Sequence, residues 1–326
     1  MRECQRKLVL FVAVIQLASG IAASQPAGVG ASKDDASPKE WTRGMRVHST
    51  GMAPTRQLSF QFKPGQFAHY EVTQRMLIVS KYPQAEEKMQ NESVTTKHYR
   101  VVAADASGVA QLEPMIDHVR MSVRFNDLAP NAYDSKVDVN PPQGFEDVAK
   151  SVGKAMARVH LTPNGELTKV TVLDGAPPAL ATAAADADPK LNFLIPLPKE
   201  PVGVGAVWKD RFQTPVVVGQ GLTQPVTMQR EFELKKIEGS LATIAFKTTV
   251  ITPIGNPQVE AQLLQRKPSG VIEFDIDRGL ILSQRTTASG EVFQAFGPNT
   301  AMQAALETTE RWLPQTTAEQ PTASRN

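Results

Sequence analysis

Residues 119–125 read VRMSVRF, and this stretch decides the fold class because apolar and polar side chains alternate along it. A period of two places the valines, the methionine and the phenylalanine on one face of an extended strand and the arginines on the other. The same alternation recurs in residues 70–78, 226–234 and 241–251. Long alternating strands joined by glycine-bearing turns predict an antiparallel sheet.

Helical patterns are scarce. Residues 145–157 are the best candidate, since an apolar stripe repeats at helical spacing along them. The stripe consists of Phe145, Val148, Ala149, Val152 and Met156. A second short helix is predicted at residues 178–185, with proline near its first turn. The predicted class is therefore mainly β, of the α+β type, with one or two short helices.

Residues 58–194 and 195–314 repeat one order of elements, which indicates an internal duplication. Each half begins with a glycine turn and a strand, and passes through a second turn into a long strand. Each then ends in a hairpin, at Asn164-Gly165 in the first half and at Arg278-Gly279 in the second. Two unrelated antiparallel meanders would also look alike, so that alternative stays open. The duplication predicts two tandem related antiparallel sheets, with the first half carrying the helical insert.

Residues 1–23 have the pattern of a secretory signal peptide, because cations precede the apolar run LVLFVAVIQLA at residues 8–18 and small residues follow it. An uncleaved N-terminal anchor is the alternative, although the run is shorter than the ~20 residues that a membrane span requires. We expect no transmembrane segment in the mature chain. Residues 24–57 are predicted to form a disordered linker, and residues 315–326 a flexible tail.

Charge and cysteine content exclude several classes of function. Residues 1–23 hold three of the 35 Lys+Arg and one of the 33 Asp+Glu, so 32 of each remain and the mature chain is formally neutral. Nucleic-acid binding requires a local surplus of cations, so we expect no nucleic-acid partner. The single cysteine, Cys4, lies in the predicted signal, which leaves no disulfide and no thiolate chemistry. Export without disulfides favours a bacterial periplasm or the extracellular space.

Residues 270–283 read GVIEFDIDRGLILS, in which a strand ends at an aspartate, a glycine turn follows and an aliphatic strand returns. Together with Leu197-Pro198 and residues 205–208 (GAVW), this pattern resembles a family of secreted bacterial β-rich proteins known only as a domain of unknown function. The strand–turn pairs resemble, more distantly, the half-barrel carriers of the LolA/LppX type, which carry lipid or lipoprotein in the periplasm. The resemblance covers about residues 58–313. It implies a curved, half-barrel-like antiparallel sheet with helices against its concave face, and it supplies no catalytic residues to carry over.

Candidate residues for catalysis or metal binding form no motif. The five histidines are His48, His69, His98, His118 and His160. No two of them have the i, i+2 or i, i+4 spacing that places both on one face, so a zinc site would have to be assembled from distant strands. Glu273, Asp275 and Asp277 share one strand face and could serve hydrolysis or hold a cation, but an apolar opposite face explains their spacing as a solvated side. We predict no catalytic residue, no metal and no cofactor.

Four residues are candidates for ligand binding. Lys97 and Arg230 occupy matching positions in the two halves, and each lies on an otherwise apolar strand face. Such a cation must be paired or reach water, because a lone buried charge is costly. Both could meet an anionic headgroup, or both could reach solvent at the sheet edge. Val152 and Met156 belong to the predicted helix, which could move as a plug to admit an acyl chain.

Three function classes remain. The first is a non-catalytic periplasmic binding or carrier protein for an apolar or amphipathic ligand, with lipid as its partner. The second is a structural or assembly protein of the bacterial cell envelope, with an envelope protein as its partner. The third is a hydrolase that uses carboxylates. An apolar cavity would favour the first class, a filled core with an exposed apolar edge the second, and carboxylates converging with a histidine the third.

The apolar run predicts that the exported protein is cleaved between about Gly20 and Ala27, where small residues suit a signal peptidase. N-terminal sequencing of the protein recovered outside the cytoplasm should begin in that window. A mature form that retains Met1 would contradict the prediction.

Overall fold

The computed structural model describes residues 44–176, 194–219 and 222–314. These residues form thirteen strands, two short α-helices and one 3-10 turn. The strands are β1 (Gly44–Ser49), β2 (Phe67–Tyr82), β3 (Ala85–Ala104), β4 (Ala110–Phe125), β5 (Asn131–Asp134), β6 (Ala157–Leu161), β7 (Leu167–Val172), β8 (Val207–Val217), β9 (Thr223–Glu238), β10 (Leu241–Val250), β11 (Ser269–Asp275), β12 (Leu280–Phe293) and β13 (Ala301–Leu313). The helical elements are α2 (Glu146–Ser151), α4 (Pro257–Leu263) and η2 (Leu264–Arg266).

All thirteen strands belong to one antiparallel sheet, which confirms the predicted mainly-β class with one or two short helices. The strand order is β1-β8-β9-β10-β11-β12-β13-β2-β3-β4-β6-β7, and β5 pairs with β4 beside this path. The two halves do not form the two separate sheets that the duplication predicts. They are joined because β13 pairs with β2 along its whole length, from Ala301↔Lys81 to Leu313↔His69.

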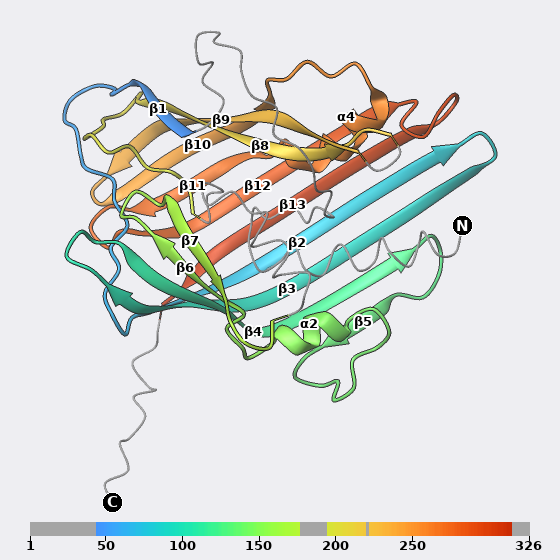
Figure 1. Ribbon diagram of the computed structural model, residues 1–326, viewed down its shortest axis with the longest axis horizontal. Coiled ribbons are helices and arrows are strands. Elements are labelled where there is room, and N and C mark those ends of the chain that lie inside the picture. The colour runs from blue at the N-terminus through green and yellow to red at the C-terminus, as the bar shows by residue number, and fades with distance from the viewer. Residues whose placement is uncertain (1–43, 177–193, 220–221, 315–326) are drawn as a thin grey trace, which may run out of the picture.

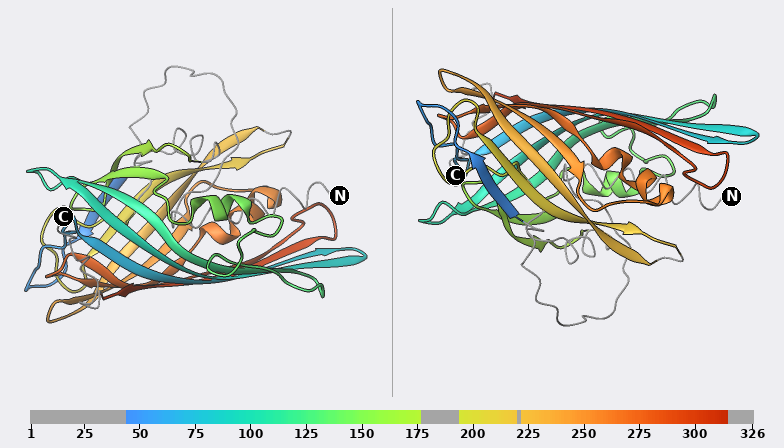
Figure 2. Two further views of the ribbon diagram at one scale, coloured as in Figure 1. Left: turned by 90° about the horizontal axis from the view of Figure 1, so that it is seen from below. Right: turned by 90° about the horizontal axis from the view of Figure 1, so that it is seen from above.

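The sheet is curved and open (Figure 1). It curls around α2 and α4, which lie on its concave side, as the half-barrel resemblance implies (Figure 2). Strands β1 and β7 stand at the two ends of the strand order and do not pair with each other, so the sheet is not closed. Among the described residues, no helix has the length and apolar character that crossing a membrane would demand.

Each half of the chain folds as a simple meander. The first half runs β2-β3-β4-β6-β7 and the second runs β8 to β13 in chain order. Lys97 lies opposite Tyr70 on β2, and Arg230 lies opposite the matching residue Asp210 on β8. A duplication requires this agreement in strand order and register, and the duplication itself stays a prediction.

The alternation in the sequence separates the concave face from the convex face. On β4, Val119, Met121 and Val123 are buried against α2, while the arginines between them are exposed. At the other end of the molecule, Trp208 and Phe232 stack at 5.5 Å and are fully buried. The connections that precede β2 and β8 cover this second cluster, and the indole of Trp208 donates a 2.8 Å hydrogen bond to the carbonyl of a proline in one of them.

The helix predicted at residues 145–157 is shorter than expected. Helix α2 ends at Ser151, and Val152 is already extended and forms a bridge to Ile116 of β4. Gly153 has a φ of +73°, a left-handed conformation that ends a helix. Met156 therefore lies outside the helix. The helix predicted at residues 178–185 falls outside the described residues.

Residues 44–57 differ from the predicted linker, because β1 pairs with β8 and Arg56 forms a bridge to Val202. The physical reason is a short apolar alternation, in which Met45 and Val47 pack against the aromatic cluster. The predicted signal peptide (residues 1–23), the first part of the predicted linker and the predicted tail (residues 315–326) lie outside the described residues.

Gly165 is expected to be intolerant of any side chain. Its φ is +77°, and an added Cβ would lie 2.4 Å from the carbonyl oxygen of Ile195 and 2.8 Å from the ring of Phe60. Gly239 has a φ of +61° with nothing within 4 Å of an added Cβ. Substitution of Gly239 by alanine therefore reports backbone strain without a steric clash. We expect Gly239→Ala to destabilise by about 1–2 kcal/mol from backbone strain, and Gly165→Ala by about 1–3 kcal/mol more from overpacking. Urea unfolding measures both, and equal losses would contradict the packing argument.

Candidate functional site

A band of polar side chains crosses the centre of the concave face. Direct cross-strand partners share a face of a sheet, and the register of four neighbouring strands aligns one row that is polar throughout and a second that is polar except for Val72 on β2. We call this set the central band. It consists of Gln284 and Thr286 on β12, Thr308 and Glu310 on β13, Gln74 on β2, and Ser93 and Thr95 on β3. Ser93 and Thr95 are buried and the others are half-buried.

Apolar clusters flank the central band. Most buried apolar side chains of the described residues fall into five clusters, and partly buried residues such as Phe62 and Ile78 link some of these clusters to one another. The aromatic cluster around Trp208 lies toward β8–β11, and the cluster around Met121 lies toward β4. The concave face is therefore amphipathic, with a polar centre between apolar flanks.

Lys97 is held on the concave face by an ion pair. Its Nζ lies 3.0 Å from Glu310 Oε1 and 5.2 Å from the ring centre of Tyr99, and its side chain is 8% exposed. Burial disfavours the charged ammonium and is the largest single influence on it, but the carboxylate of Glu310 and the hydroxyl of Tyr99 together outweigh that penalty, so the pKa of Lys97 is raised. Burial and the same carboxylate raise the pKa of Tyr70. Lys97 is thus a cation with a partner and does not reach solvent at a sheet edge.

Arg230 is compensated in the same way on β9. Its Nη2 lies 2.7 Å from Asp210 Oδ2, and the Asp210 side chain is 5% exposed. The guanidinium stands 5.0 Å from the ring centre of Phe212 and 5.8 Å from that of Phe232. Both predicted cations therefore face the concave side with a carboxylate beside them. They are not brought together, because β10–β13 and β2 lie between β9 and β3.

Three polar atoms on the concave face are buried and have no hydrogen-bond partner among the described residues. They are Asn91 Oδ1, Arg230 Nε and Thr248 Oγ1. Asn91 and Thr248 are 3% and 4% exposed, and Thr248 pairs directly with Arg230 across β10 and β9. An unpaired buried polar group costs about 1–3 kcal/mol. One of these unsatisfied groups lies on β3, two residues from Ser93 of the central band, and the other two lie on β9 and β10.

The other two predicted ligand-binding residues lie near one another along the chain but have different settings. Val152 is half-buried and packs at the edge of the cluster between α2 and β4. Met156 is 2% exposed and precedes β6, where its carbonyl accepts a hydrogen bond from Leu173. Neither belongs to α2, so a moving helix would not carry them. Their part in ligand binding stays a prediction.

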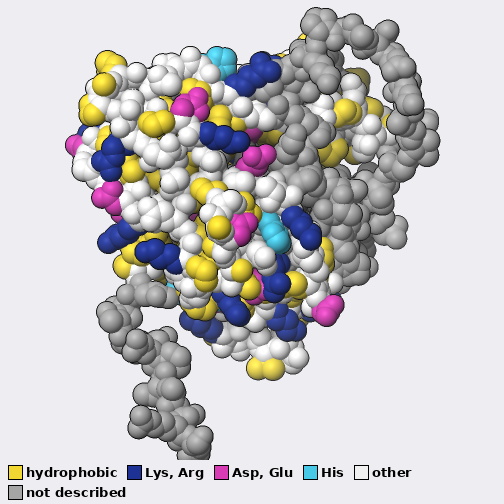
Figure 3. Space-filling model, turned by 60° about the vertical axis from the view of Figure 1, so that its left-hand side comes forward, with side chains coloured by type: hydrophobic (Ala, Val, Ile, Leu, Met, Phe, Trp, Pro, Cys, Tyr) yellow, Lys and Arg dark blue, Asp and Glu magenta, His cyan; other side chains and the backbone are white. Residues whose placement is uncertain are grey.

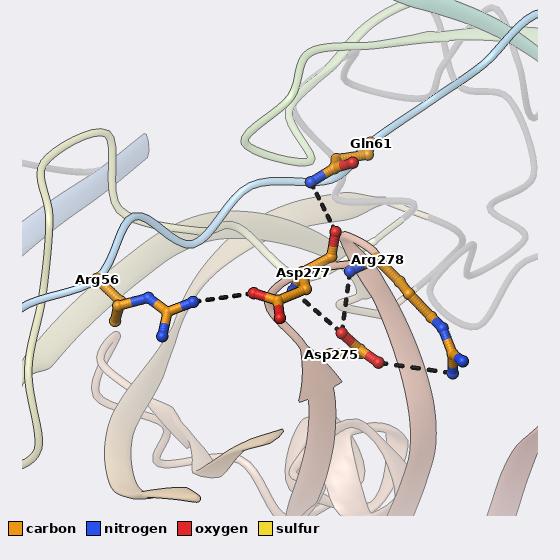
Figure 4. A network of polar contacts seen from close by, with 5 residues as sticks. All are labelled: Arg56, Gln61, Asp275, Asp277 and Arg278. Carbon is orange, nitrogen blue, oxygen red and sulfur yellow. Dashed lines mark hydrogen bonds and ion pairs between the residues drawn. The ribbon is translucent and has the colours of Figure 1, made fainter. Parts of the chain in front are cut away.

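The aspartates of residues 270–283 do not converge with a histidine. They stabilise the β11–β12 turn and hold residues 56–61 against it (Figure 4). Asp275 Oδ1 accepts from the backbone of Asp277 and Arg278 at 3.0 and 2.9 Å. Asp277 pairs with Arg56 at 2.9 Å, and its carbonyl accepts from Gln61. These contacts fasten residues 56–61 to the β11–β12 turn. A cavity of about 300 Å³ beside this turn is lined by Gln61, Lys63, Gln66, Asp277, Arg278, Leu280 and Trp312.

Four of the five histidines, His69, His98, His118 and His160, lie on the convex side of the first half, and His48 lies on β1. His118 Nε2 lies 2.8 Å from Asp134 Oδ1, and this hydrogen bond is the largest cause of the lowered pKa of Asp134. His69 and His98 are directly opposite each other on β2 and β3, and both approach Asp117 of β4. These three residues are far apart in the sequence, and the pairing of β2, β3 and β4 brings them together.

One end of the molecule carries both signs of charge. Figure 3 shows Lys and Arg side chains dispersed among Asp, Glu and apolar side chains over the face turned to the viewer. The face in this view therefore does not present charge of a single sign.

Comparison with known proteins gives no family for the chain. No family model matches it, and no curated protein matches it. Solved structures with partial similarity include a lipovitellin studied for its lipid–protein interactions, with a TM-score of 0.41, 13% identity and coverage of 80% of this chain. The chain spans about a quarter (26%) of the length of that lipovitellin chain.

Two further solved structures are similar over comparable lengths. DynF, from the dynemicin biosynthesis pathway of Micromonospora chersina, has a TM-score of 0.20 and 7% identity, covering 81% of this chain and 89% of its own. OccK11 (OpdR) of Pseudomonas aeruginosa has a TM-score of 0.18 and 8% identity, covering 80% of this chain and 100% of its own. All three TM-scores lie below 0.5, so function has to be argued from the side chains of this chain.

The Lys97–Glu310 pair yields a stability prediction. Glu310→Gln leaves a buried ammonium without its counter-charge and should destabilise the protein by about 3–5 kcal/mol. The double variant Lys97→Met with Glu310→Leu removes both charges and should cost far less, since a buried ion pair is often replaceable by apolar groups. Urea unfolding at pH 7 measures both. A Glu310→Gln loss below 1 kcal/mol would show that Lys97 reaches water.

Proposed function

We propose that this protein is a non-catalytic binding or carrier protein that holds an amphipathic ligand on the concave face of its sheet. The observation that carries the proposal is the set of buried, unpartnered polar atoms on a face whose flanks are apolar. A ligand with polar groups would satisfy those atoms while its apolar part covers the aromatic and aliphatic clusters. Ligand sites of this kind combine an apolar lining with a few placed polar groups.

The charge balance of the face favours a ligand without net negative charge. Lys97 and Arg230 each have a carboxylate within 3.0 Å, so each contributes a neutral pair. An anionic headgroup would have to displace Glu310 or Asp210 and leave that carboxylate buried. The hydroxyl and amide groups of the central band can both donate and accept hydrogen bonds. A neutral or zwitterionic headgroup therefore suits the face better than the anionic headgroup considered from the sequence.

The carboxylates do not support a hydrolase. Asp275 accepts hydrogen bonds within the β11–β12 turn, and Asp277 pairs with Arg56. Glu273 accepts a 2.7 Å hydrogen bond from Ser283. A general acid–base pair needs two such groups facing a common substrate. We also propose that the protein acts in the bacterial periplasm or outside the cell, for which the N-terminal sequence of the mature form is the test.

A second candidate function, assembly with another envelope component, is favoured by exposed apolar side chains at one end of the sheet. The turns after β2, β4, β8 and β12 lie at the same end because these strands run in one direction. They carry Tyr82, Leu128, Val217, Leu222, Phe293 and Phe296. Phe293 is 70% exposed, and Tyr82 stacks on Phe296 at 5.4 Å. Exposed apolar groups gathered at one place commonly mark an interaction surface.

The carrier proposal is tested with a matched pair of isosteric variants. Thr308 belongs to the central band, whereas Thr309 is its neighbour on the convex face. Losing one hydrogen bond to the ligand removes about 0.5–1.5 kcal/mol, so Thr308→Val should weaken binding of monoolein or lysophosphatidylcholine by about 2- to 12-fold. Thr309→Val should leave affinity unchanged. Isothermal titration calorimetry provides both values, with oleate as the anionic comparison that should bind more weakly.

Two results would overturn the carrier proposal. One is that the wild-type protein binds none of the three amphiphiles, which would favour the assembly function instead. The other is that Thr308→Val and Thr309→Val change affinity equally, which would place the ligand away from the central band.

A further inference from the structure

Three potential metal ligands converge on the convex face, away from the proposed ligand site. They are His69 on β2, His98 on β3 and Asp117 on β4, and their ligand atoms all lie within 4.8 Å of one another. His98 Nδ1 is 2.7 Å from Asp117 Oδ1, and His69 Nδ1 is 3.8 Å from Asp117 Oδ2. The three residues come from three adjacent strands, so the paired backbone holds them in place.

The backbone around Asp117 is irregular in a way that aims its side chain. Thr96 of β3 pairs with His118, and the next residue, Lys97, pairs with Ile116, so Asp117 is the extra residue of a β-bulge. A bulge redirects a side chain out of the regular alternation and is common beside functional sites. Here the redirected carboxylate reaches both histidines, which regular pairing would not bring to a common point.

The surroundings orient the two imidazoles. The ring of Phe67 lies 6.2 Å from that of His69 and 5.5 Å from that of His98. The His98 side chain is 10% exposed, while those of His69 and Asp117 are 33% and 37% exposed, so the cluster is fixed on one side and open to solvent on the other.

We propose that His69, His98 and Asp117 bind a divalent transition-metal ion, with zinc as the best match. Zinc takes imidazole nitrogen and carboxylate oxygen at about 2.0–2.2 Å in tetrahedral geometry. Three protein ligands would leave the fourth position to water on the open side. The ion would replace the hydrogen bond between His98 and Asp117 and would cross-link β2, β3 and β4. This site is independent of the concave face and of the proposed carrier function.

The experiment is a zinc titration of the purified full chain against a competing chromophoric chelator, with three variants. His69→Gln and Asp117→Asn each remove one ligand while keeping a polar side chain of similar size. We expect each to weaken zinc binding at least about tenfold, the scale reached when even an outer partner of a zinc ligand is lost. His118→Gln is the matched control, since His118 also pairs with an aspartate at 2.8 Å but has no second histidine beside it among the described residues.

A second readout separates loss of the site from loss of the fold. X-ray absorption at the zinc edge should show two imidazole ligands in the wild type and one in His69→Gln, and the melting temperature should rise with zinc only where the site is intact. Circular dichroism confirms that each variant keeps its sheet. Zinc binding that is equal in the wild type, His69→Gln and Asp117→Asn would overturn the proposal. So would a wild-type dissociation constant in the millimolar range or weaker.

Discussion

Every charge that the concave face buries must be compensated on that face, and this constraint organises the molecule. The Lys97–Glu310 pair meets it by bridging β3 and β13 across β2. That contact is available only in the register in which Val72 lies opposite both Glu310 and Thr95. A slip of one residue would turn Glu310 to the convex face and leave the ammonium alone. The ion pair therefore helps to fix the register of these strands as well as to stabilise the fold.

The same constraint explains why the interior is divided. A sheet with an apolar concave face could close over its helices as one continuous core. The central band prevents this by placing hydroxyl and amide groups between the aromatic cluster at β8–β11 and the cluster around Met121 at β4. Groups of that kind are stable in an interior only when something satisfies them. Most groups of the central band have partners among the described residues, whereas Asn91 Oδ1 and Thr248 Oγ1, outside the band, have none. A bound amphiphile therefore accounts for the face better than a finished core does.

Local sequence patterns predicted the faces of the strands but not their partners. The alternation in residues 119–125 correctly separated buried from exposed positions, because a period of two is a property of a single strand. Lys97 and Arg230 were correctly placed on the concave-facing side of their strands. Glu310 could not be assigned to Lys97, because more than 200 residues separate them and only the β13–β2 pairing brings them together. The three residues on the convex face were missed for the same reason, since the bulge at Asp117 has no sequence signature.

The helices were harder to predict than the strands. Apolar spacing extended the first helix to residue 157, whereas the backbone is already extended at Val152 and left-handed at Gly153. Helix α4 was overlooked although its start carries a recognisable signal, since Asn256 caps it and Pro257 opens its first turn. The strand β1 was hidden in a segment of low complexity because only Met45 and Val47 mark its buried face.

The pairing of the last strand with the first long one has a consequence for how the chain is made. Strands β2–β4 and β8–β12 can each pair with neighbours in sequence as they emerge, but β2 has no partner on its other edge until β13 has been synthesised. Contacts between residues so distant in sequence form slowly, because the entropic cost of closing the long intervening loop comes before the favourable free energy of strand pairing. Until then the nascent protein presents two long unpaired edges, on β2 and β12, of the kind that join other chains. The interval between synthesis of residue 82 and of residue 313 is therefore the period in which a holding chaperone would protect this protein.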